Sequence, residues 1–214
     1  MPRDRLDVYF SLRSPYAWLG LLRLSRVLEH YSPPVSWHPI WPRQDLPFAD
    51  TVANPAKASY LVEDVGRQVA ALGLPLKWPR SVDTDWKLPH ACCLVAADEG
   101  LALPFTLDMF SLRFSHGHDL ADRSVIANAA GNCGLDAEQL IERASSQATA
   151  DRLDACHAGA RRKDIFGVPF FVYGKKRYWG GDRVEWLLRQ LMIDNGDMKN
   201  EALADPLAAP HGSR

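Results

Sequence analysis

Strand-like sequence lies only near the two ends of this chain, and the long stretch between them is patterned as helix. Near the start, Leu6–Ser11 alternates and is rich in β-forming residues, and Val35–Pro39 is a second short run of the same kind. Between them, Ser14 is a good helix N-cap and Pro15 suits the first helical position, and apolar residues then recur at helical spacing to about His30. The opening therefore predicts a β-α-β unit with parallel strands.

The second strand-like region is close to the other end. Val168–Tyr173 is strongly β-forming, Gly174 to Lys176 read as a turn, and Arg177–Trp179 is a short partner strand, so this region predicts a β-hairpin. A last helix is predicted from Arg183 to about Ile193. The order at this end is therefore β-β-α.

The middle of the chain shows helical periodicity, with Gly or Pro between its segments. Predicted helices cover residues 54–73, 90–99, 103–115, 122–132 and 136–160, and residues 42–53 and 74–86 are predicted loops. We therefore predict an α/β protein in which a thioredoxin-like β-α-β / β-β-α domain is interrupted by an all-helical insert. The predicted division is 1–40 for the N-terminal half, 41–160 for the insert, 161–194 for the C-terminal half and 195–214 for a flexible tail.

Composition narrows the classes of partner. The 25 basic and 26 acidic residues give a net charge of −1, which argues against nucleic acid. No run approaches the ~20 apolar residues of a membrane span, and the start lacks the apolar segment of a signal peptide, so we expect a cytoplasmic protein with no membrane association. The four cysteines have neither a Cys-x-x-Cys nor a metal-ligand spacing, so we expect free thiols and no metal site.

Ser14 occupies the junction of the first strand and first helix. The N–H groups and dipole of a helix N-terminus favour an anion there, and in thioredoxin-like redox proteins a cysteine thiolate uses that position. Here the two relevant positions are Ser14 and Ala17, which excludes dithiol exchange at this site. A serine hydroxyl could instead donate a hydrogen bond to a thiolate brought by a ligand. Ser14 could equally serve only as an N-cap, and the local sequence does not decide between the two.

Pro169 stands at the start of the strongest predicted strand. Proline removes a ladder donor, so its presence at a strand start is either an edge feature or a functional one. In thioredoxin folds such a proline is cis and faces the helix N-terminus, which leaves the backbone of the preceding residue, here Val168, free to pair with an extended peptide-like ligand.

Several further motifs occur in the same order as in a known family. They are Phe10–Gly20, Pro55–Leu61 with Asp64 and Arg67, Leu72–Pro75 with Trp78 and Pro79, Phe166–Pro169, and Tyr178–Arg183. Together they span roughly residues 6 to 193. In these motifs the chain resembles the 2-hydroxychromene-2-carboxylate isomerases and the related kappa-class glutathione transferases, which have a DsbA-like thioredoxin scaffold.

The resemblance implies glutathione as a cofactor and assigns its site residues. Ser14 matches the serine that faces the glutathione sulfur, and Val168, before Pro169, matches the residue whose backbone pairs with the cysteinyl part. The residues matched to the two ends of glutathione are Asp182 and Arg183 for the γ-glutamyl group and Lys57 for the glycyl carboxylate or an acidic substrate.

Two departures from the family pattern concern Gly181 and the loop Arg80–Leu88. Gly181 stands where a larger polar residue is common, and the loop lacks the family's asparagine-containing pattern.

The resemblance also implies an activity. It predicts a glutathione-dependent isomerase that acts on an aromatic carboxylic acid through a transient thiol adduct, as in the degradation of aromatic hydrocarbons. Trp41, Tyr60 and Trp86 are candidates for the aromatic pocket, although core packing is the commoner role of such residues. A kappa-class-like glutathione transferase and a non-catalytic thioredoxin-fold binding protein remain alternatives, and relatives suggest a homodimer.

Overall fold

The structure, a computed structural model, describes residues 4–43, 46 and 54–198. Its strands are β1 (Leu6–Phe10), β2 (Val35–Pro39), β3 (Phe170–Tyr173) and β4 (Lys176–Trp179). Its helices are α1 (Pro15–Leu28), α2 (Pro55–Ala71), α3 (Lys87–Asp98), α4 (Ala102–Phe114), α5 (Arg123–Asn132), α6 (Ala137–Ala144), α7 (Gln147–Arg162) and α8 (Val184–Asp194), with a 3₁₀ turn at Gly181–Arg183 before α8.

The four strands form one sheet in the order β2-β1-β3-β4. β1 pairs in parallel with β2, with Leu6 opposite Val35, and antiparallel with β3, with Leu6 opposite Tyr173. β3 pairs antiparallel with β4. The two ends of the chain therefore build one sheet, which confirms the predicted thioredoxin-like fold.

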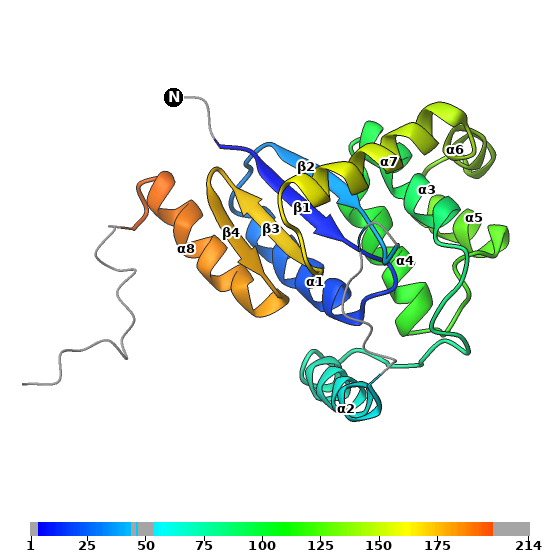
Figure 1. The fold of residues 1–214 in the computed structure, drawn as a ribbon, viewed down its shortest axis with the longest axis horizontal. Helices are drawn as coiled ribbons and strands as arrows, with labels where there is room; N and C mark the ends of the chain where they lie inside the picture. The colour runs from blue at the N-terminus through cyan, green and yellow to red at the C-terminus, as the bar shows by residue number, and fades with distance from the viewer. Residues whose placement is uncertain (1–3, 44–45, 47–53, 199–214) are drawn as a thin grey trace, which may run out of the picture.

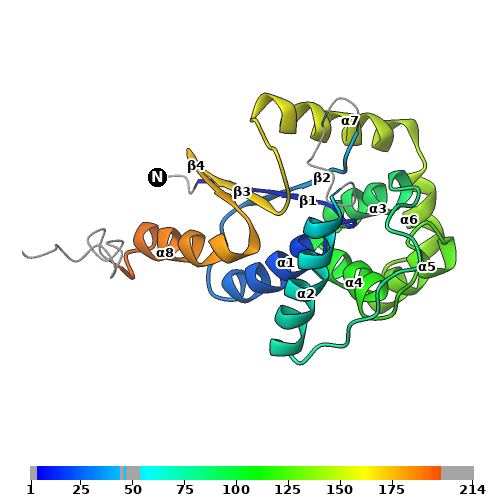
Figure 2. The same ribbon diagram turned by 60° about the horizontal axis from the view of Figure 1, so that its bottom comes forward.

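The sheet has a helix layer on each side. Figure 2 shows α7 on one side of the sheet and α1 with α8 on the other, while α3 to α6 gather beyond the β2 edge. In Figure 1 the α2 helix lies apart from that group, close to the beginning of α1. The N-terminus of α1 thus lies where the carboxyl end of β1 meets the helical insert.

Several predicted boundaries were wrong: α3 begins at Lys87 and not at residue 90, β4 begins at Lys176, and two further differences have a clear physical reason. The segment 136–160 was predicted as one helix, but α6 and α7 are separate, because the Ser146 hydroxyl donates to the Arg143 carbonyl and accepts from the Thr149 N–H, which starts a new helix. The strand predicted from Val168 begins at Phe170, because the proline before it has no N–H for the ladder. The predicted tail lies outside the described residues from 199 onward.

The core runs through both the sheet and the insert. Aromatic residues join them, and Trp18 of α1 stacks on Phe114 of α4 with ring centroids 5.7 Å apart. Among the described residues, no helix combines the length and the apolar character that a membrane crossing requires.

Candidate active site at the start of helix α1

Ser14 is the N-cap of α1. Its backbone is extended, and its hydroxyl oxygen accepts a hydrogen bond from the Ala17 N–H at 3.2 Å. Within the described part of the chain, the Ser14 hydroxyl donates to no group. The side chain therefore fulfils the capping role and still has a donor for a ligand at the positive end of the helix.

The turn that leads to Ser14 is held by hydrogen bonds from its amides. The Arg13 N–H donates to the Ser11 hydroxyl at 3.3 Å, and the Ser14 N–H donates to the Ser11 carbonyl at 3.0 Å. The Leu12 N–H donates out of the turn, to Nε2 of His90 in α3, at 3.0 Å. Sequence reasoning assigned no role to His90, because nothing in a helical apolar run indicates which loop amide it meets.

Two segments that are distant in the sequence, the loop with Pro169 and the turn with Gly181, meet on one side of α1 at Gly20. A Cβ placed on Gly20 would lie 2.6 Å from the Pro169 Cγ and 3.3 Å from the Gly181 Cα. Gly20 is six residues after Ser14, about 9 Å along the helix axis. The proline loop and the start of the last helical segment thus pack on α1 at about 9 Å along its axis from Ser14, a separation close to the ~10 Å that three extended residues span.

Val168 precedes a cis peptide bond to Pro169, as the thioredoxin fold predicts. The Pro169 carbonyl accepts from the Gly180 N–H at 2.9 Å, which extends the β3–β4 ladder. Neither the N–H nor the carbonyl of Val168 takes part in a hydrogen bond with any other described residue. These two groups are thus available to an extended ligand.

Asp182 and Arg183 are exposed at the turn before α8, and their side chains form an ion pair at 2.6 Å. Gly181 beside them is buried, and a Cβ on it would lie 3.0 Å from both the Gly20 Cα and an Arg23 nitrogen. The close approach of the two backbones therefore explains the glycine that departs from the family pattern, because a larger side chain would push the turn away from α1.

Lys57 and Tyr60 lie on α2. Lys57 is exposed in its first turn, and Tyr60 is 58% exposed. The same helix is held near Ser14 by Asp64, whose carboxylate accepts a hydrogen bond from the Tyr16 hydroxyl at 3.1 Å. Burial, followed by the Asp64 carboxylate, raises the pKa of Tyr16 to about 12. The structure therefore connects α2 to the first turn of α1, but it does not bring the Lys57 side chain into contact with Ser14 or Val168.

The other two aromatic candidates differ in accessibility. Trp41 is half-buried and stacks on His90, with ring centroids 5.0 Å apart. Trp86 is only 6% exposed, and its indole N–H donates to Asp83 at 3.2 Å. Trp86 therefore leaves little ring surface for a substrate, and the pocket assignments of all three aromatic residues stay predictions.

The loop at residues 80–88 joins the site through Asp83. The Asp83 carboxylate accepts two hydrogen bonds from Arg13, at 2.6 and 3.1 Å, and the Arg13 guanidinium lowers the pKa of Asp83. From inside, the buried Arg113 donates to the Val82 carbonyl at 2.6 Å. Sequence reasoning named Trp86 in this loop and missed the Arg13–Asp83 pair, since a contact over 70 residues leaves no local pattern.

None of the four cysteines forms a disulfide or lies at Ser14. Cys92, Cys93 and Cys156 are buried and Cys133 is half-buried, as expected for free thiols. Burial raises the pKa of Cys93 to about 12 and that of Cys156 to about 11. The described thiols are therefore poor nucleophiles at neutral pH.

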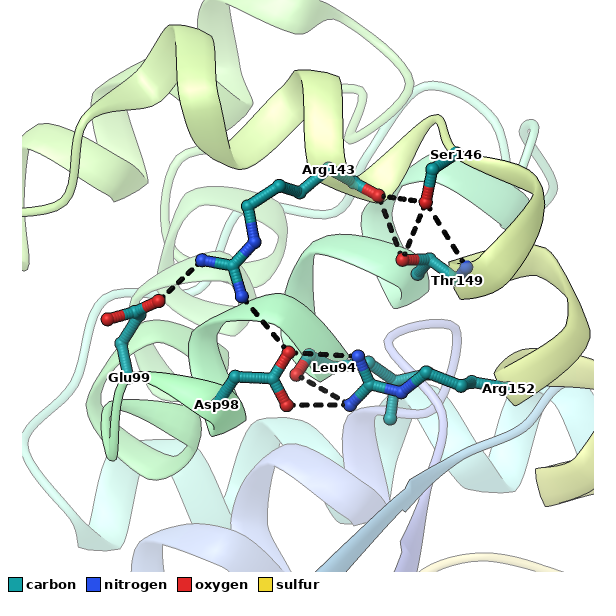
Figure 3. A network of polar contacts seen from close by, with 7 residues as sticks. All are labelled: Leu94, Asp98, Glu99, Arg143, Ser146, Thr149 and Arg152. Carbon is teal, nitrogen blue, oxygen red and sulfur yellow. Dashed lines mark hydrogen bonds and ion pairs between the residues drawn. The ribbon is translucent and has the colours of Figure 1, made fainter.

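A hollow of about 450 Å³ lies away from this region, at the β2 edge, and Trp37, Asp98 and Arg152 are among its lining residues. It contains none of the predicted site residues, and its charged groups pair with each other, as Figure 3 shows for Asp98 and Arg152. The hollow therefore offers no chemistry to the site around Ser14.

Comparison with known proteins agrees with this architecture. Residues 5–192 match the DSBA-like thioredoxin domain family. A 2-hydroxychromene-2-carboxylate isomerase of Sphingobium xenophagum is 25% identical over 197 residues, covering 87% of this chain and 97% of the relative. The isomerase of the same name from Pseudomonas putida is 25% identical over 204 residues, covering 91% and 99%.

Solved structures show the same fold. A 2-hydroxychromene-2-carboxylate isomerase superposes with a TM-score of 0.79 at 22% identity, covering 94% of this chain and all of the other. The cytosolic disulfide reductase DsbM from Pseudomonas aeruginosa, solved with GSH, superposes with a TM-score of 0.65 at 15% identity, covering 91% of this chain and all of the other.

Proposed function

We propose that this chain, which belongs to the DSBA-like thioredoxin domain family, is a glutathione-dependent isomerase of the 2-hydroxychromene-2-carboxylate type that acts on an aromatic carboxylic acid. The observation that carries the proposal is Ser14, which caps α1 and keeps a hydroxyl donor where the fold's redox members have a cysteine. Two curated relatives of this name, each aligned over most of its length, support the choice of reaction.

The residues around Ser14 fit glutathione in size and in donor chemistry. A tripeptide needs backbone partners, and the Val168 N–H and carbonyl are unpaired among the described residues. Its γ-glutamyl group carries a carboxylate and an ammonium, which suit Arg183 and Asp182. The disulfide reductase DsbM, which has the same fold, was solved with GSH, and this supports the choice of glutathione as a ligand for the scaffold.

When bound, glutathione supplies a thiolate that adds to the substrate and leaves unchanged, which permits rotation about a bond. The chain's part is to stabilise and aim that thiolate. The Ser14 hydroxyl donates to the sulfur, and the first N–H groups of α1 add the favourable end of the helix dipole. Val168 fixes the cysteinyl backbone, and Asp182 with Arg183 fixes the far end.

The test is turnover of 2-hydroxychromene-2-carboxylate, followed by its absorbance, with and without glutathione. We expect turnover only with the thiol, and we expect the free glutathione concentration to stay constant. Consumption of glutathione would instead identify a transferase, and absence of heat on titration with millimolar glutathione would leave a binding protein of another kind.

Ser14→Ala separates chemistry from capping. Loss of a hydrogen bond to a charged sulfur, worth about 1.5–3 kcal/mol, should lower kcat roughly 10- to 150-fold. Ser146→Ala is the matched control, because Ser146 caps α7 through an equal 3.2 Å bond to the Thr149 N–H. Both variants should lose about 1 kcal/mol of stability. Equal activity in both would show that Ser14 is only a cap.

A further inference from the structure

His90 is a buried, neutral histidine that holds the turn before Ser14. It is 0% exposed; its Nε2 accepts from the Leu12 N–H at 3.0 Å, and its Nδ1 lies 2.7 Å from the Trp86 carbonyl oxygen. An amide can only donate and a carbonyl can only accept. The ring must therefore carry its single proton on Nδ1.

His157 in α7 repeats the arrangement at the neighbouring loop. Its Nε2 accepts from the Trp41 N–H at 3.2 Å, and its Nδ1 lies 2.9 Å from the Leu153 carbonyl oxygen. Each histidine thus bonds the carbonyl four residues earlier in the chain and the amide of a loop outside its helix. The two loops are those that follow β1 and β2 in the sheet.

Trp41 connects the two histidines. Its ring stacks on His90 at an angle of 25°, and it meets His157 edge-on, with centroids 4.3 Å apart. The insert therefore holds the loops at the carboxyl ends of β1 and β2 through one His–Trp–His unit, His90–Trp41–His157. Of the two histidines, only His90 bonds to the turn that contains Ser14, because its partner Leu12 lies two residues before Ser14.

We propose that His90 is a positioning residue of the active site: by fixing the Leu12 amide, it aims the Ser14 hydroxyl and the first N–H groups of α1 at the reacting thiol. The identity of that thiol as glutathione rests on the proposed function. The placement of the turn by His90 does not, so the two can be tested separately.

The test uses Ser14→Cys, in which the introduced thiol reports on the helix N-terminus without any ligand. Its pKa is measured from the pH dependence of alkylation, followed at that peptide by mass spectrometry. At a helix N-terminus the thiol should titrate below the ordinary value of about 8.5. Further substitutions are then added to this variant.

Two substitutions of His90 separate its bond to the Trp86 carbonyl from its bond to the Leu12 amide. In His90→Asn the amide can still donate to the Trp86 carbonyl but is too short to accept from Leu12. In His90→Gln the longer side chain can place its oxygen near the Nε2 position and accept from Leu12. His157→Asn is the matched control, since it removes the equivalent bond to Trp41. We expect His90→Asn to raise the thiol pKa by about 1 unit, and the other two to change it by less than about 0.3.

Unfolding in urea provides the structural comparison, because each Asn variant loses one buried hydrogen bond and should lower the urea midpoint by a similar amount. The proposal is overturned if His90→Asn leaves the thiol pKa unchanged, or if His157→Asn raises it as much. With Ser14 in place, His90→Asn should lower kcat about 10-fold, which corresponds to 1.4 kcal/mol, with little change in KM for glutathione. A protein that fails to bind glutathione would refute the proposed function while the alkylation result still decides the role of His90.

Discussion

Gly20 and Gly131 both lie inside α-helices, but only Gly20 lies against another segment. A Cβ on Gly20 would come within 2.6 Å of Pro169. A Cβ on Gly131 would have no neighbouring segment within 4 Å. We predict that Gly20→Ala destabilises the protein by about 1–3 kcal/mol through overpacking. Gly131→Ala should stabilise it by about 0.5–1 kcal/mol, since alanine is the better helix former.

Urea unfolding of both variants measures these changes. Gly20→Ala should also weaken glutathione binding in calorimetry, because the displaced proline loop carries Val168. Stabilisation by both substitutions would mean that the proline loop is not packed on α1 in solution.

At the same scale, sequence reasoning identified Ser14 and Pro169 but not their neighbours. A serine before a proline has a local signature, and the family motifs point to the same positions. His90 and Asp83 act on the site over 78 and 70 residues of sequence, so no local pattern encodes them. Ser14 itself could not be separated from a plain N-cap, because Ser146 and Asn54 cap their helices in the same way.

Among the elements, α3, α6 and α7 are joined by a charged network around Asp98 (Figure 3). Its carboxylate accepts from Arg152 at 2.7 and 2.9 Å and from Arg143 at 3.2 Å, and Arg143 also pairs with Glu99. The network sets α7 against α3, the two helices that carry His157 and His90. The network therefore stabilises the packing of α3 on α7, the two helices whose histidines bond to the loops of the site.

Asp98→Asn tests the contribution of this ionic network to stability. It should cost about 1 kcal/mol, more than a single exposed pair, because two guanidinium groups lose their shared partner. Glu185→Gln, which breaks only the i,i+4 pair with Arg189, should cost no more than about 0.5 kcal/mol. In 1 M salt, where the screening length is about 3 Å, the two variants should converge toward wild type. A loss at Asp98 that is insensitive to salt would contradict an ionic origin.

The elements were easier to predict than their ends. Periodicity identified each described helix and strand region, because amphipathic spacing follows directly from burial on one side. The break between α6 and α7 was missed, because Ser145 and Ser146 interrupt the helix by bonding to its carbonyls and not by a Gly or Pro signal.

In the whole molecule, the buried and half-buried histidines make stability depend on acidity. Burial lowers the pKa of His90 to about 3, and burial likewise lowers those of His38 and His157. In the unfolded chain a histidine takes up a proton near pH 6.5. Below that pH the unfolded state binds more protons than the folded state, so the stability contributed by these neutral rings is present above pH 6.5 and is lost as the pH falls.

We predict that the free energy of unfolding falls below pH 6.5, and that His90 alone contributes a slope of about 1.4 kcal/mol per pH unit. Urea unfolding between pH 7 and pH 4 measures the slope. His90→Gln should flatten it by about that amount, because glutamine cannot be protonated. Equal slopes in wild type and His90→Gln would mean that the His90 ring is charged in the folded protein, which its bond from the Leu12 amide does not allow.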